Sequence, residues 1–455
     1  MEQKGWAGKL ENQKSFFRQG GTREIVLRIE ALRRFQSVLS AHETELLEAL
    51  KKDLNKPNLE AYVSELYFLS KELDLVCKQL KSWLKPTKVG NPLYFFPAKS
   101  WIKREPFGAA LIIAPWNYPV QLAFAPLIAA IAAGNTVFLK PSEIAKATEQ
   151  VILKIVNEAF PEKWVFCPTG GEQASKQLLG MEFQFVFFTG STAIGRLVEK
   201  SLAGRLIPSV LELGGKSPCI IQRPKSLTKT VSRILTGKFF NAGQTCFCPD
   251  FIAVHQSQKD QLLKELDKQI QSRYPKGDLT DLAATPSESH AERVKSMRLD
   301  NARIYGEDSG CQVAPTVQLV ERDSALLREE IFGPLLPVVS YDTEQELIDI
   351  LDPLDSSLAL YLFSDDHEFT GRVADSFASG SVCINDTMKQ GSNLALPFGG
   401  VGASGMGRYR GKWGVEQFSY PRAYTKRYFL PDPFEIRPPY GNAFASMRRF
   451  LKMRK

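Results

Sequence analysis

Short apolar segments alternate with helical segments from Gly108 onward, and this alternation constrains the fold more than any other feature of the sequence. Uninterrupted apolar runs are typical of strands buried on both faces, and helices between them indicate helical layers on both sides of the sheet. The predicted strands cover residues 109–114, 136–140, 164–167, 183–188 and 210–213. The predicted helices cover residues 120–132, 145–160, 172–179 and 193–202. The sequence therefore predicts an α/β fold built on a parallel sheet.

Further predicted elements lie on either side of this region. Apolar residues spaced three or four positions apart predict two long amphipathic helices over 23–54 and 59–84. After Gly214 a second α/β domain is expected, with helices near 231–240 and 258–274 and strands near 251–254, 335–340 and 381–385. A proline in the extended segment 93–103 fits badly in a central strand. This segment is therefore predicted to form an arm that pairs with the last strand-like segment, 417–428.

Polar and glycine-containing segments follow several of the predicted strands. They read Pro115-Trp116-Asn117, Lys140-Pro141-Ser142-Glu143, Thr189-Gly190-Ser191 and Glu212-Leu213-Gly214-Gly215. Parallel sheets bind ligands at the carboxyl ends of their strands. We therefore expect these segments to form a site.

Cys246 lies in a short polar segment, 241–250, that contains a glycine and a proline. We expect it at the start of a helix that follows a loop, where backbone N–H groups favour a thiolate. From the residues alone, a buried structural cysteine is the competing interpretation.

The composition argues against several other kinds of site. The seven cysteines are scattered and the four histidines lie far apart, so neither a disulfide framework nor a metal site is expected. Most of the net charge of +8 comes from segment 437–455, which holds six Lys or Arg and no acidic residue, so nucleic-acid binding is not expected. No apolar run approaches about 18 residues and no signal peptide is recognisable. A cytoplasmic location is therefore expected.

Seven short segments carry a resemblance to a known family. They are Pro115-Trp116-Asn117-Tyr118-Pro119, Lys140-Pro141-Ser142-Glu143, Phe188-Thr189-Gly190-Ser191-Thr192, Glu212-Leu213-Gly214-Gly215-Lys216-Ser217-Pro218, Gly243-Gln244-Thr245-Cys246, Glu329-Glu330-Ile331-Phe332-Gly333-Pro334 and Leu396-Pro397-Phe398-Gly399-Gly400. In this order they resemble the aldehyde dehydrogenase superfamily, and within it the class 3 or fatty aldehyde dehydrogenase branch. The resemblance implies a Rossmann-like NAD(P)-binding domain (1–83 and 107–214), an α/β catalytic domain (215–410), oligomerisation arms (84–106 and 411–436) and a basic C-terminal tail (437–455).

The chemistry of this family gives three of these residues a role. A planar aldehyde does not readily release hydride, so a thiolate adds first and the thioester formed later is hydrolysed by activated water. The resemblance implies Cys246 as the nucleophile and Glu212 as the general base. It also implies the Asn117 amide and the backbone N–H of Cys246 as donors to the oxyanion. From the residues alone, Asn117 could instead fix a turn and Glu212 could be a solvated carboxylate.

A nicotinamide cofactor is expected although the chain lacks the Gly-x-Gly-x-x-Gly fingerprint after a strand. Gly190 and Ser191, between a predicted strand and helix, are placed to offer backbone N–H groups to a diphosphate. The resemblance adds further cofactor contacts: Lys140 and Glu143 at the adenosine ribose, Trp116, and Glu330 with Phe332 at the nicotinamide ribose and ring. A carboxylate near the ribose 2′-hydroxyl favours NAD, and class 3 relatives often accept NADP as well.

The substrate side of the site is less clearly marked. Phe398 is expected to line the aldehyde tunnel, with core packing as the alternative. Met388-Lys389-Gln390-Gly391 stands where the family has a histidine and a longer apolar loop, which weakens any inference about the substrate. Segment 280–291 lacks the family's glycine-arginine motif.

The function that the resemblance implies is NAD(P)-dependent oxidation of medium-chain, long-chain or aromatic aldehydes to carboxylic acids. An acylating, coenzyme A-dependent dehydrogenase and a catalytically silent binding protein on the same fold are the alternatives. A homodimer formed through the arms is a further expectation. The basic tail is expected either to be solvated or to make a weak peripheral membrane contact.

Overall fold

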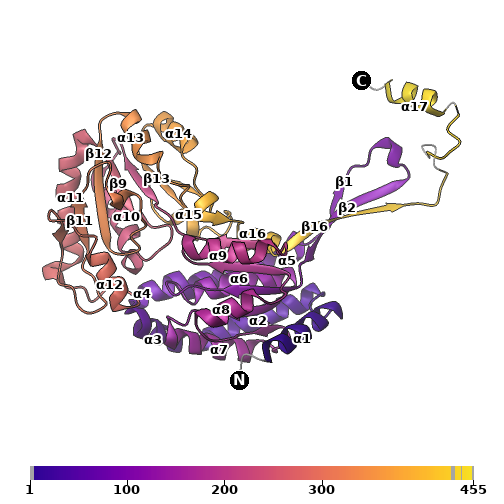
Figure 1. Ribbon diagram of the computed structural model, residues 1–455, viewed down its shortest axis with the longest axis horizontal. Coiled ribbons are helices and arrows are strands. Elements are labelled where there is room, and N and C mark those ends of the chain that lie inside the picture. The colour runs from indigo at the N-terminus through magenta and orange to yellow at the C-terminus, as the bar shows by residue number, and fades with distance from the viewer. Residues whose placement is uncertain (1–4, 432–435, 442, 453–455) are drawn as a thin grey trace.

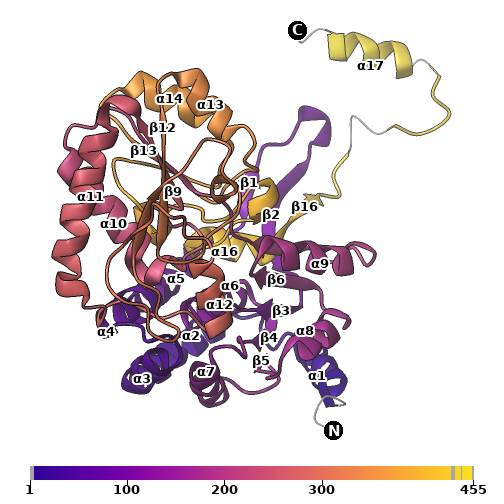
Figure 2. The same cartoon turned by 60° about the vertical axis from the view of Figure 1, so that its left-hand side comes forward.

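The computed structural model describes residues 5–431, 436–441 and 443–452. Its strands form three sheets, with the orders β15-β7-β6-β3-β4-β5, β10-β11-β12-β9-β8-β13-β14 and β1-β2-β16. Figures 1 and 2 show two α/β units side by side in the body of the molecule and the third sheet projecting from it. The α/β class predicted from the sequence is confirmed.

The first sheet contains the five strands predicted between residues 109 and 213. They are β3 (Ala109–Ile113), β4 (Thr136–Lys140), β5 (Val165–Phe166), β6 (Phe185–Thr189) and β7 (Ser209–Glu212). These five are parallel, and β15 (Gly405–Met406) adds an antiparallel strand beside β7. The chain order reverses at β3, which pairs with β4 on one side and with β6 on the other. The carboxyl ends of β3 and β6 therefore form a switch point of the kind at which open α/β sheets bind ligands.

Helices cover both faces of this sheet, because alternate side chains of each strand point to opposite sides. On β3, Ala110 and Ile112 face a core shared with α2, α3, α5, α6 and α7, whereas Leu111 and Ile113 face a core shared with α1, α8 and α9. The bounds are α1 (Trp6–Arg18), α2 (Ile25–Ala41), α3 (Glu43–Leu54), α5 (Phe68–Trp83), α6 (Gln121–Ala133), α7 (Lys146–Ala159), α8 (Glu172–Leu179) and α9 (Thr192–Ala203). The four helices predicted between residues 120 and 202 are confirmed.

The N-terminal helices differ from the prediction in two respects. Helix α1 precedes the predicted helices and buries Trp6 and Leu10. Segment 23–54 is not one helix, because the backbone at His42 (φ −98°, ψ 13°) separates α2 from α3. Apolar spacing continues across this break, so periodicity alone does not reveal it. Segment 59–84 is helical as predicted, with α4 (Asn58–Ala61) and a π-helical turn (Tyr62–Tyr67) before α5.

The second sheet is also mostly parallel and has helices on both faces. Its strands are β8 (Pro218–Ile221), β9 (Phe251–His255), β10 (Arg303–Ile304), β11 (Thr316–Leu319), β12 (Leu335–Tyr341), β13 (Leu360–Phe363) and β14 (Val382–Ile384). Its helices are α10 (Leu227–Phe239), α11 (Lys259–Arg273), α12 (Glu288–Lys295), α13 (Glu344–Leu351), α14 (His367–Ser376) and α15 (Lys389–Ser392). The predicted strands β9, β12 and β14 and helices α10 and α11 are confirmed. The prediction missed the two-residue strand β10, the four-residue strands β8, β11 and β13, and the helices α12, α13 and α14, which have only eight to ten residues each.

The third sheet is a long arm. Strands β1 (Thr87–Val89), β2 (Ala98–Pro106) and β16 (Ser419–Arg427) form it, and β16 pairs with β2 from Ser419 opposite Pro106 to Arg427 opposite Ala98. The predicted pairing of the two arm segments is therefore confirmed. Helix α16 (Gly411–Gln417) leads into β16 and places Gly414 against Ala129 of α6 in the body.

The C-terminal end of the chain lies beyond the arm. Helix α17 (Ala443–Lys452) stands apart from the body in both ribbon views. Among the described residues, no helix is long and apolar enough to cross a membrane.

Candidate active site

The loop that carries Cys246 connects α10 to β9 and has an unusual backbone. Asn241 and Ala242 have positive φ angles of 51° and 52°, and Gly243 follows with φ 73°. A side chain on Gly243 would collide with the carbonyl of Gly333, so glycine is required there. Cys246 itself lies in a turn, and the next regular element is strand β9. The expected helix after Cys246 is therefore absent, and that prediction was wrong: the chain must re-enter the second sheet at Phe251 instead.

Hydrogen bonds from distant parts of the chain hold this loop in place. The backbone N–H of Asn241 donates to the Glu60 carboxylate at 2.9 Å. The Gln244 amide donates to the carbonyl of Ala284 at 3.0 Å. The hydroxyls of Tyr118 and Thr245 lie 2.6 Å apart. The loop is thus fixed from the first domain and from the second.

Asn117 comes after β3 and reaches the same loop. Its side-chain amide donates to the carbonyl of Gln244 at 2.9 Å, two residues before Cys246. Its own carbonyl accepts from Lys56 at 3.0 Å and from the Asn241 amide at 2.9 Å. The sequence-predicted pair Asn117 and Cys246 is therefore brought together, with Asn117 buried behind the loop.

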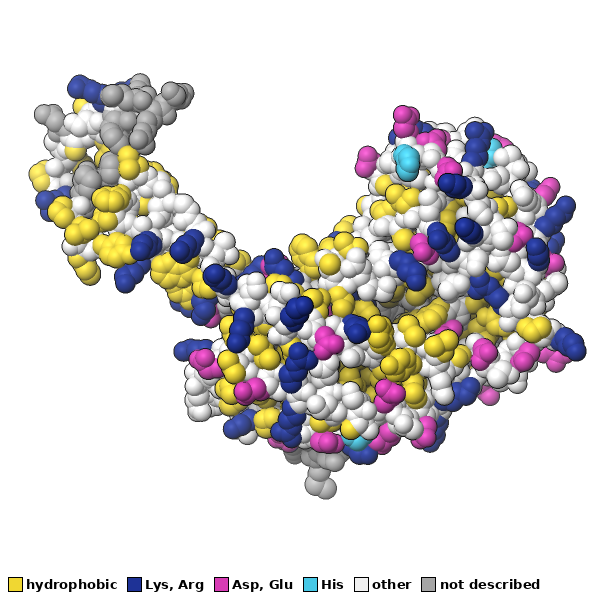
Figure 3. Space-filling model, turned by 180° about the vertical axis from the view of Figure 1, so that it is seen from behind, with side chains coloured by type: hydrophobic (Ala, Val, Ile, Leu, Met, Phe, Trp, Pro, Cys, Tyr) yellow, Lys and Arg dark blue, Asp and Glu magenta, His cyan; other side chains and the backbone are white. Residues whose placement is uncertain are grey.

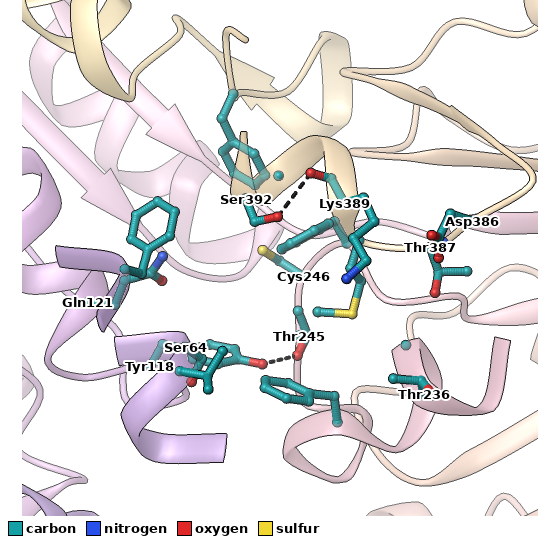
Figure 4. Close-up of a pocket in the computed structure, with 18 of the residues that line it drawn as sticks. Ser64, Tyr118, Gln121, Thr236, Thr245, Cys246, Asp386, Thr387, Lys389 and Ser392 are labelled. Carbon is teal, nitrogen blue, oxygen red and sulfur yellow. Dashed lines mark hydrogen bonds between the residues drawn. The ribbon is translucent and has the colours of Figure 1, made fainter. Parts of the chain in front are cut away.

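A cavity of about 430 Å³ opens beside Cys246. Phe398 forms part of its wall, and its ring lies 5.2 Å from that of Phe247. Figure 4 shows Cys246 near the centre of this cavity, with Tyr118 and Thr245 on one side and Lys389 on another. The cavity is large enough for a small organic ligand and has mainly apolar walls.

Glu212 is buried at the end of β7, and neither of its carboxylate oxygens has a hydrogen-bond partner among the described residues. A Cβ atom on Gly399 would lie 3.0 Å from one of these oxygens, so the glycine loop after Phe398 packs directly against the carboxylate. Burial raises the pKa of Glu212 well above its ordinary value, and Arg410 and Arg408 oppose this only in part. An unsatisfied buried carboxylate with a raised pKa is typical of a general acid or base.

Glu330 is the second carboxylate close to Cys246. Its oxygens lie where a Cβ atom on Gly214 would stand, so the carboxylate packs directly against the backbone of Gly214. Burial and the nearby Asp250 raise the pKa of Glu330 to about 8. Burial, followed by the charges of Glu330 and Glu212, raises the pKa of the Cys246 thiol, while Arg410 lowers it. The raised pKa favours the protonated form of the thiol.

The predicted cofactor residues cluster at the carboxyl ends of the first sheet. Ser191 caps helix α9, with its hydroxyl accepting from the Ile194 N–H at 3.4 Å. The N–H of Gly190 donates to the carbonyl of Glu212 at 3.0 Å, which leaves the first turn of α9 as the local source of free N–H groups. Lys140 pairs with Glu143 at 2.7 Å.

Aromatic residues join the two domains beside this cluster. The rings of Trp116 and Phe332 lie 5.5 Å apart, edge to face, and His290 lies 5.7 Å from Trp116. His290 also contacts the carbonyl of Phe332 at 2.8 Å. The structure thus brings Trp116 and Phe332 together, and His290 is a contact that the sequence did not reveal.

Comparison with known proteins identifies the family to which this arrangement belongs. The family model described as "Aldehyde dehydrogenase family" matches residues 11–424. The chain belongs to the aldehyde dehydrogenase family. It is 39% identical to a 4,4'-diaponeurosporen-aldehyde dehydrogenase of Staphylococcus aureus, over 98% of both chains. It is 37% identical to mouse aldehyde dehydrogenase family 3 member B1, over 91% of this chain and 90% of that one.

Solved structures agree with this assignment. A Staphylococcus aureus AldH in a substrate-bound state superimposes with a TM-score of 0.94 at 39% identity, over 98% of this chain and 99% of that one. The protein is therefore an NAD(P)-dependent oxidoreductase that acts on aldehydes. The aldehyde dehydrogenase-like fold implied by the seven sequence segments is confirmed.

The residues at the switch point of this aldehyde dehydrogenase fit a dinucleotide. The Thr189 hydroxyl, at the end of β6, is buried and has no hydrogen-bond partner. The first turn of α9 adjoins it, and helix N-termini bind phosphate groups. Glu143 is only half-buried, and its carboxylate can accept hydrogen bonds from ribose hydroxyls.

Sequence reasoning missed several charged residues of the site. Asp250 is buried and pairs with Lys216 at 2.7 Å and with Lys238 at 3.1 Å. Asp250 also accepts the N–H of Ile331 at 3.1 Å, next to Glu330. Arg410 lies buried in the wall of the cavity. Lys216 falls within a segment that the resemblance used, but no local spacing marks Asp250, Lys238 or Arg410.

Proposed function

We propose that Cys246 is the nucleophile, Glu212 the general base and Asn117 an oxyanion donor in the oxidation of aldehydes to carboxylic acids. The observation that carries this proposal is the position of Cys246 in the cavity wall, within electrostatic reach of the buried Glu212 and the partly buried Glu330. A thiol with a raised pKa needs a base, and a carboxylate whose pKa is also raised is a stronger proton acceptor.

In the first step the Cys246 sulfur bonds to the aldehyde carbon, and the thiol proton passes through Glu212 or Glu330 to solvent, so that Glu212 is ionised again before hydrolysis. The carbonyl oxygen gains the negative charge and forms a thiohemiacetal. The Asn117 amide has two N–H groups, and only one of them is used by the Gln244 carbonyl. Its second N–H and the backbone N–H of Cys246 support the assignment of an oxyanion site at this point.

NAD or NADP, when bound, supplies the hydride acceptor that converts the thiohemiacetal into a thioester. Glu212 then takes a proton from water, the oxygen of that water bonds to the thioester carbon, and the C–S bond breaks to free the acid and the Cys246 thiolate. This step requires the ionised form of Glu212. Because burial raises the pKa of Glu212, we expect hydrolysis to become faster as the pH rises.

The preferred cofactor is proposed to be NAD, with NADP tolerated. Glu143 supports this preference, since its carboxylate would repel a ribose 2′-phosphate. Lys140, paired with Glu143 at 2.7 Å, weakens that repulsion and supports tolerance of NADP. Glu330 and Phe332 are proposed to hold the nicotinamide ribose and ring, with Trp116 beside them.

The substrate is proposed to be a medium-chain, long-chain or aromatic aldehyde. The mainly apolar walls of the cavity, with Phe398 and Phe247 in contact, support this class. The Staphylococcus aureus relative is named for the aldehyde 4,4'-diaponeurosporen-aldehyde.

The test is the formation of reduced nicotinamide by purified protein with NAD or NADP and a series of aldehydes. Cys246→Ala should abolish turnover. Glu212→Gln should give one rapid turnover of bound enzyme followed by a slow steady state, because the thioester then accumulates. An undiminished steady state in Glu212→Gln that depends on added coenzyme A would instead favour the acylating alternative.

The assembly of the protein is a further proposal. The projecting arm carries exposed apolar side chains, among them Phe96 and Phe429, beside basic ones (Figure 3). This supports a homodimer formed through the arms, because exposed apolar patches of this kind mark interaction sites. Size determination by light scattering with and without Phe96→Asp checks it, and a monomeric wild-type protein would contradict it.

A weak peripheral membrane contact through the tail is the least supported proposal. Helix α17 carries Phe444 and two adjacent arginines, Arg448 and Arg449, and Phe444 is exposed. Of the residues proposed for its apolar face, the side chains of Phe450 and Leu451 lie outside the described residues. All seven cysteines are free, which supports a reducing, cytoplasmic location. Equal binding of full-length and tail-deleted protein to anionic vesicles would contradict the membrane contact.

A further inference from the structure

Arg410 is a buried cation in the wall of the Cys246 cavity. Its side chain is 3% exposed. The guanidinium carbon lies 4.4 Å from the ring centre of Phe68 and 4.7 Å from that of Phe398. Two aromatic faces therefore hold the planar group in one orientation, with its charge directed at the same cavity as the nucleophile.

The hydrogen bonds of Arg410 leave its charge without a counter-ion. Its terminal nitrogens meet the oxygen of the Gln121 amide at 2.7 and 3.3 Å when that amide is oriented to satisfy both groups. Its Nε is buried and has no hydrogen-bond partner. No carboxylate oxygen of the described residues lies within 4.0 Å of the guanidinium. Within the part of the chain that the structure describes, an amide oxygen is thus the strongest acceptor that Arg410 meets.

The other buried cations near the site differ from Arg410. Lys56 pairs with Glu65 at 2.5 Å, and Lys216 and Lys238 both pair with Asp250. A buried charge is costly unless an opposite charge lies in contact with it. Where the chain buries lysines for structural reasons it supplies a carboxylate, and at Arg410 it does not.

The nearest acidic residues do not fill this role. The charge of Arg410 acts to lower the pKa of Glu72 and of Glu212, but neither carboxylate lies at ion-pair distance from the guanidinium. One oxygen of Glu72 accepts the N–H of Gly411 at 2.9 Å, and the other has no partner. Burial raises the pKa of both carboxyls, and Arg410 opposes this shift without forming an ion pair with either.

The remaining charges of the cavity add to its positive character. Arg233 lies 3.8 Å from Asp386, so these two largely cancel. Lys389 has no carboxylate within 4.0 Å among the described residues, and Figure 4 shows its side chain directed into the cavity beside Cys246. A cavity with two unpaired cations and apolar walls matches a ligand that has an apolar chain and an anionic group.

We propose that Arg410 binds an anionic group of the substrate, so that the preferred aldehyde also carries a carboxylate. This inference rests on the proposed function, because the aldehyde end of the same molecule must reach Cys246. Arg410 is then a specificity-determining residue that exchanges its weak amide contact for a charge-assisted hydrogen bond to the substrate.

The test compares ω-oxo carboxylic acids of increasing length with their methyl esters, which have the same aldehyde and chain but no charge. The ratio of kcat/KM for acid to that for ester is measured in the wild-type, Arg410→Gln and Arg410→Lys proteins. The control variant is Lys412→Gln, which removes an exposed positive charge two residues away. The ratio cancels any effect of Arg410 on the reactivity of Cys246 itself.

We expect the wild-type protein to prefer the acid at one or more chain lengths. Arg410→Gln should lower the ratio about 10- to 150-fold, the range of a lost hydrogen bond to a charged group, and mainly through KM. Arg410→Lys should lower it less, and Lys412→Gln should leave it unchanged. Should Arg410→Gln fail to fold, a ratio that is lowered in Arg410→Lys still supports the proposal.

Two results would overturn the inference. One is a wild-type protein without preference for the acid at any length. The other is an equal loss of activity on acid and ester in the Arg410 variants, which would assign Arg410 to the Cys246 thiolate instead. Both leave oxidation of the neutral esters intact in the wild-type protein, whereas failure to oxidise any aldehyde would refute the proposed function itself.

Discussion

Asp250 and Glu212 are two carboxylates with almost the same exposure, 2% and 3%, and opposite surroundings. Burial alone would raise the pKa of Asp250, but Lys216 and Lys238 hold it below its ordinary value. Glu212 has no hydrogen-bond partner, and burial raises its pKa. One carboxylate is fully paired, and the other is left with unmet hydrogen-bonding capacity.

This difference distinguishes a charged group that stabilises the fold, Asp250, from one whose surroundings suit a role in the reaction, Glu212. The Asp250 cluster links the loop before β8, helix α10 and the segment next to Glu330, so its charges hold parts of the second α/β unit together. Glu212 contributes no such contact and lies within electrostatic reach of Cys246. A buried polar group without a partner costs stability, and such a cost is common where a group must be free to react.

The largest expected effect is that of Glu212→Gln on activity. Loss of the base should reduce the steady-state rate of aldehyde oxidation by about 10²- to 10⁴-fold. The resistance to urea should not fall, because the carboxylate has no partner to lose. Stopped-flow and steady-state measurements of reduced nicotinamide, together with urea unfolding, check both parts. A variant that turns over normally would remove the distinction between the two carboxylates.

Asp250→Asn should have the opposite effect: it should mainly lower the free energy of unfolding. It leaves two buried lysines without a counter-charge, and breaking a buried ion pair costs about 3–5 kcal/mol. Urea unfolding followed by tryptophan fluorescence measures this loss. Adding Lys238→Met to the variant should recover part of it. A loss below about 1 kcal/mol would show that the cluster is not structural.

The Glu60 carboxylate accepts fewer hydrogen bonds than Asp250 and more than Glu212. Its raised pKa predicts that the stability of the protein depends on pH. Glu60 accepts one N–H, from Asn241, and burial raises its pKa from 4.5 to about 7. The folded protein therefore binds more protons than the unfolded chain between these values, so stability falls as the pH rises from about 4.5 to about 7. Over this pH range the free energy of unfolding should fall by up to about 3 kcal/mol because of Glu60.

Glu60→Gln should flatten this dependence, because the amide oxygen can still accept the Asn241 N–H without titrating. The measurement is the urea midpoint of both proteins at several pH values between 5 and 8, read as a difference so that other titrating groups cancel. If the urea midpoints of the two proteins change with pH in the same way, Glu60 is not the cause of the pH dependence of stability.

The smallest effect is expected at the surface. Arg372 donates two hydrogen bonds to Glu344, at 3.0 and 2.9 Å, and both side chains are well exposed. Exposed ion pairs contribute little, so Arg372→Ala should cost less than about 1 kcal/mol in urea unfolding. A cost approaching that of Asp250→Asn would show that burial is not what distinguishes the charged groups of this protein.

Much of the fold could be predicted because its signals are local. Each of the five parallel strands of the first sheet contains a short apolar run, and each intervening helix has apolar residues of its own, so both were located from neighbouring residues. The helix break at His42 and the short strands β8, β11 and β13 were missed, because four residues or one backbone angle leave no periodic signal. The helix expected after Cys246 was wrong because tertiary contacts, such as Asn241 with Glu60, set the loop instead.

The residues of the candidate site also form two groups: those that the sequence marks and those that only the structure reveals. Cys246, Glu212 and Asn117 stand in short segments whose order resembles a known family, so the sequence marks them. Their roles remain proposals. Arg410, His290 and Asp250 carry no local signal, because their partners are remote in the chain: Arg410 packs on Phe68, and Asp250 pairs with Lys216.

The sequence by itself determined the alternation that builds the parallel sheets, the strand ends at which reactive side chains gather, and the family to which the chain belongs. Only the tertiary structure decided which buried charges are paired and which are not. The physical reason is that burial and pairing depend on contacts between segments far apart in the chain. In the sequence, Asp250 and Glu212 are both simply acidic residues. In the folded protein two lysines form ion pairs with Asp250, and none of the described lysines pairs with Glu212.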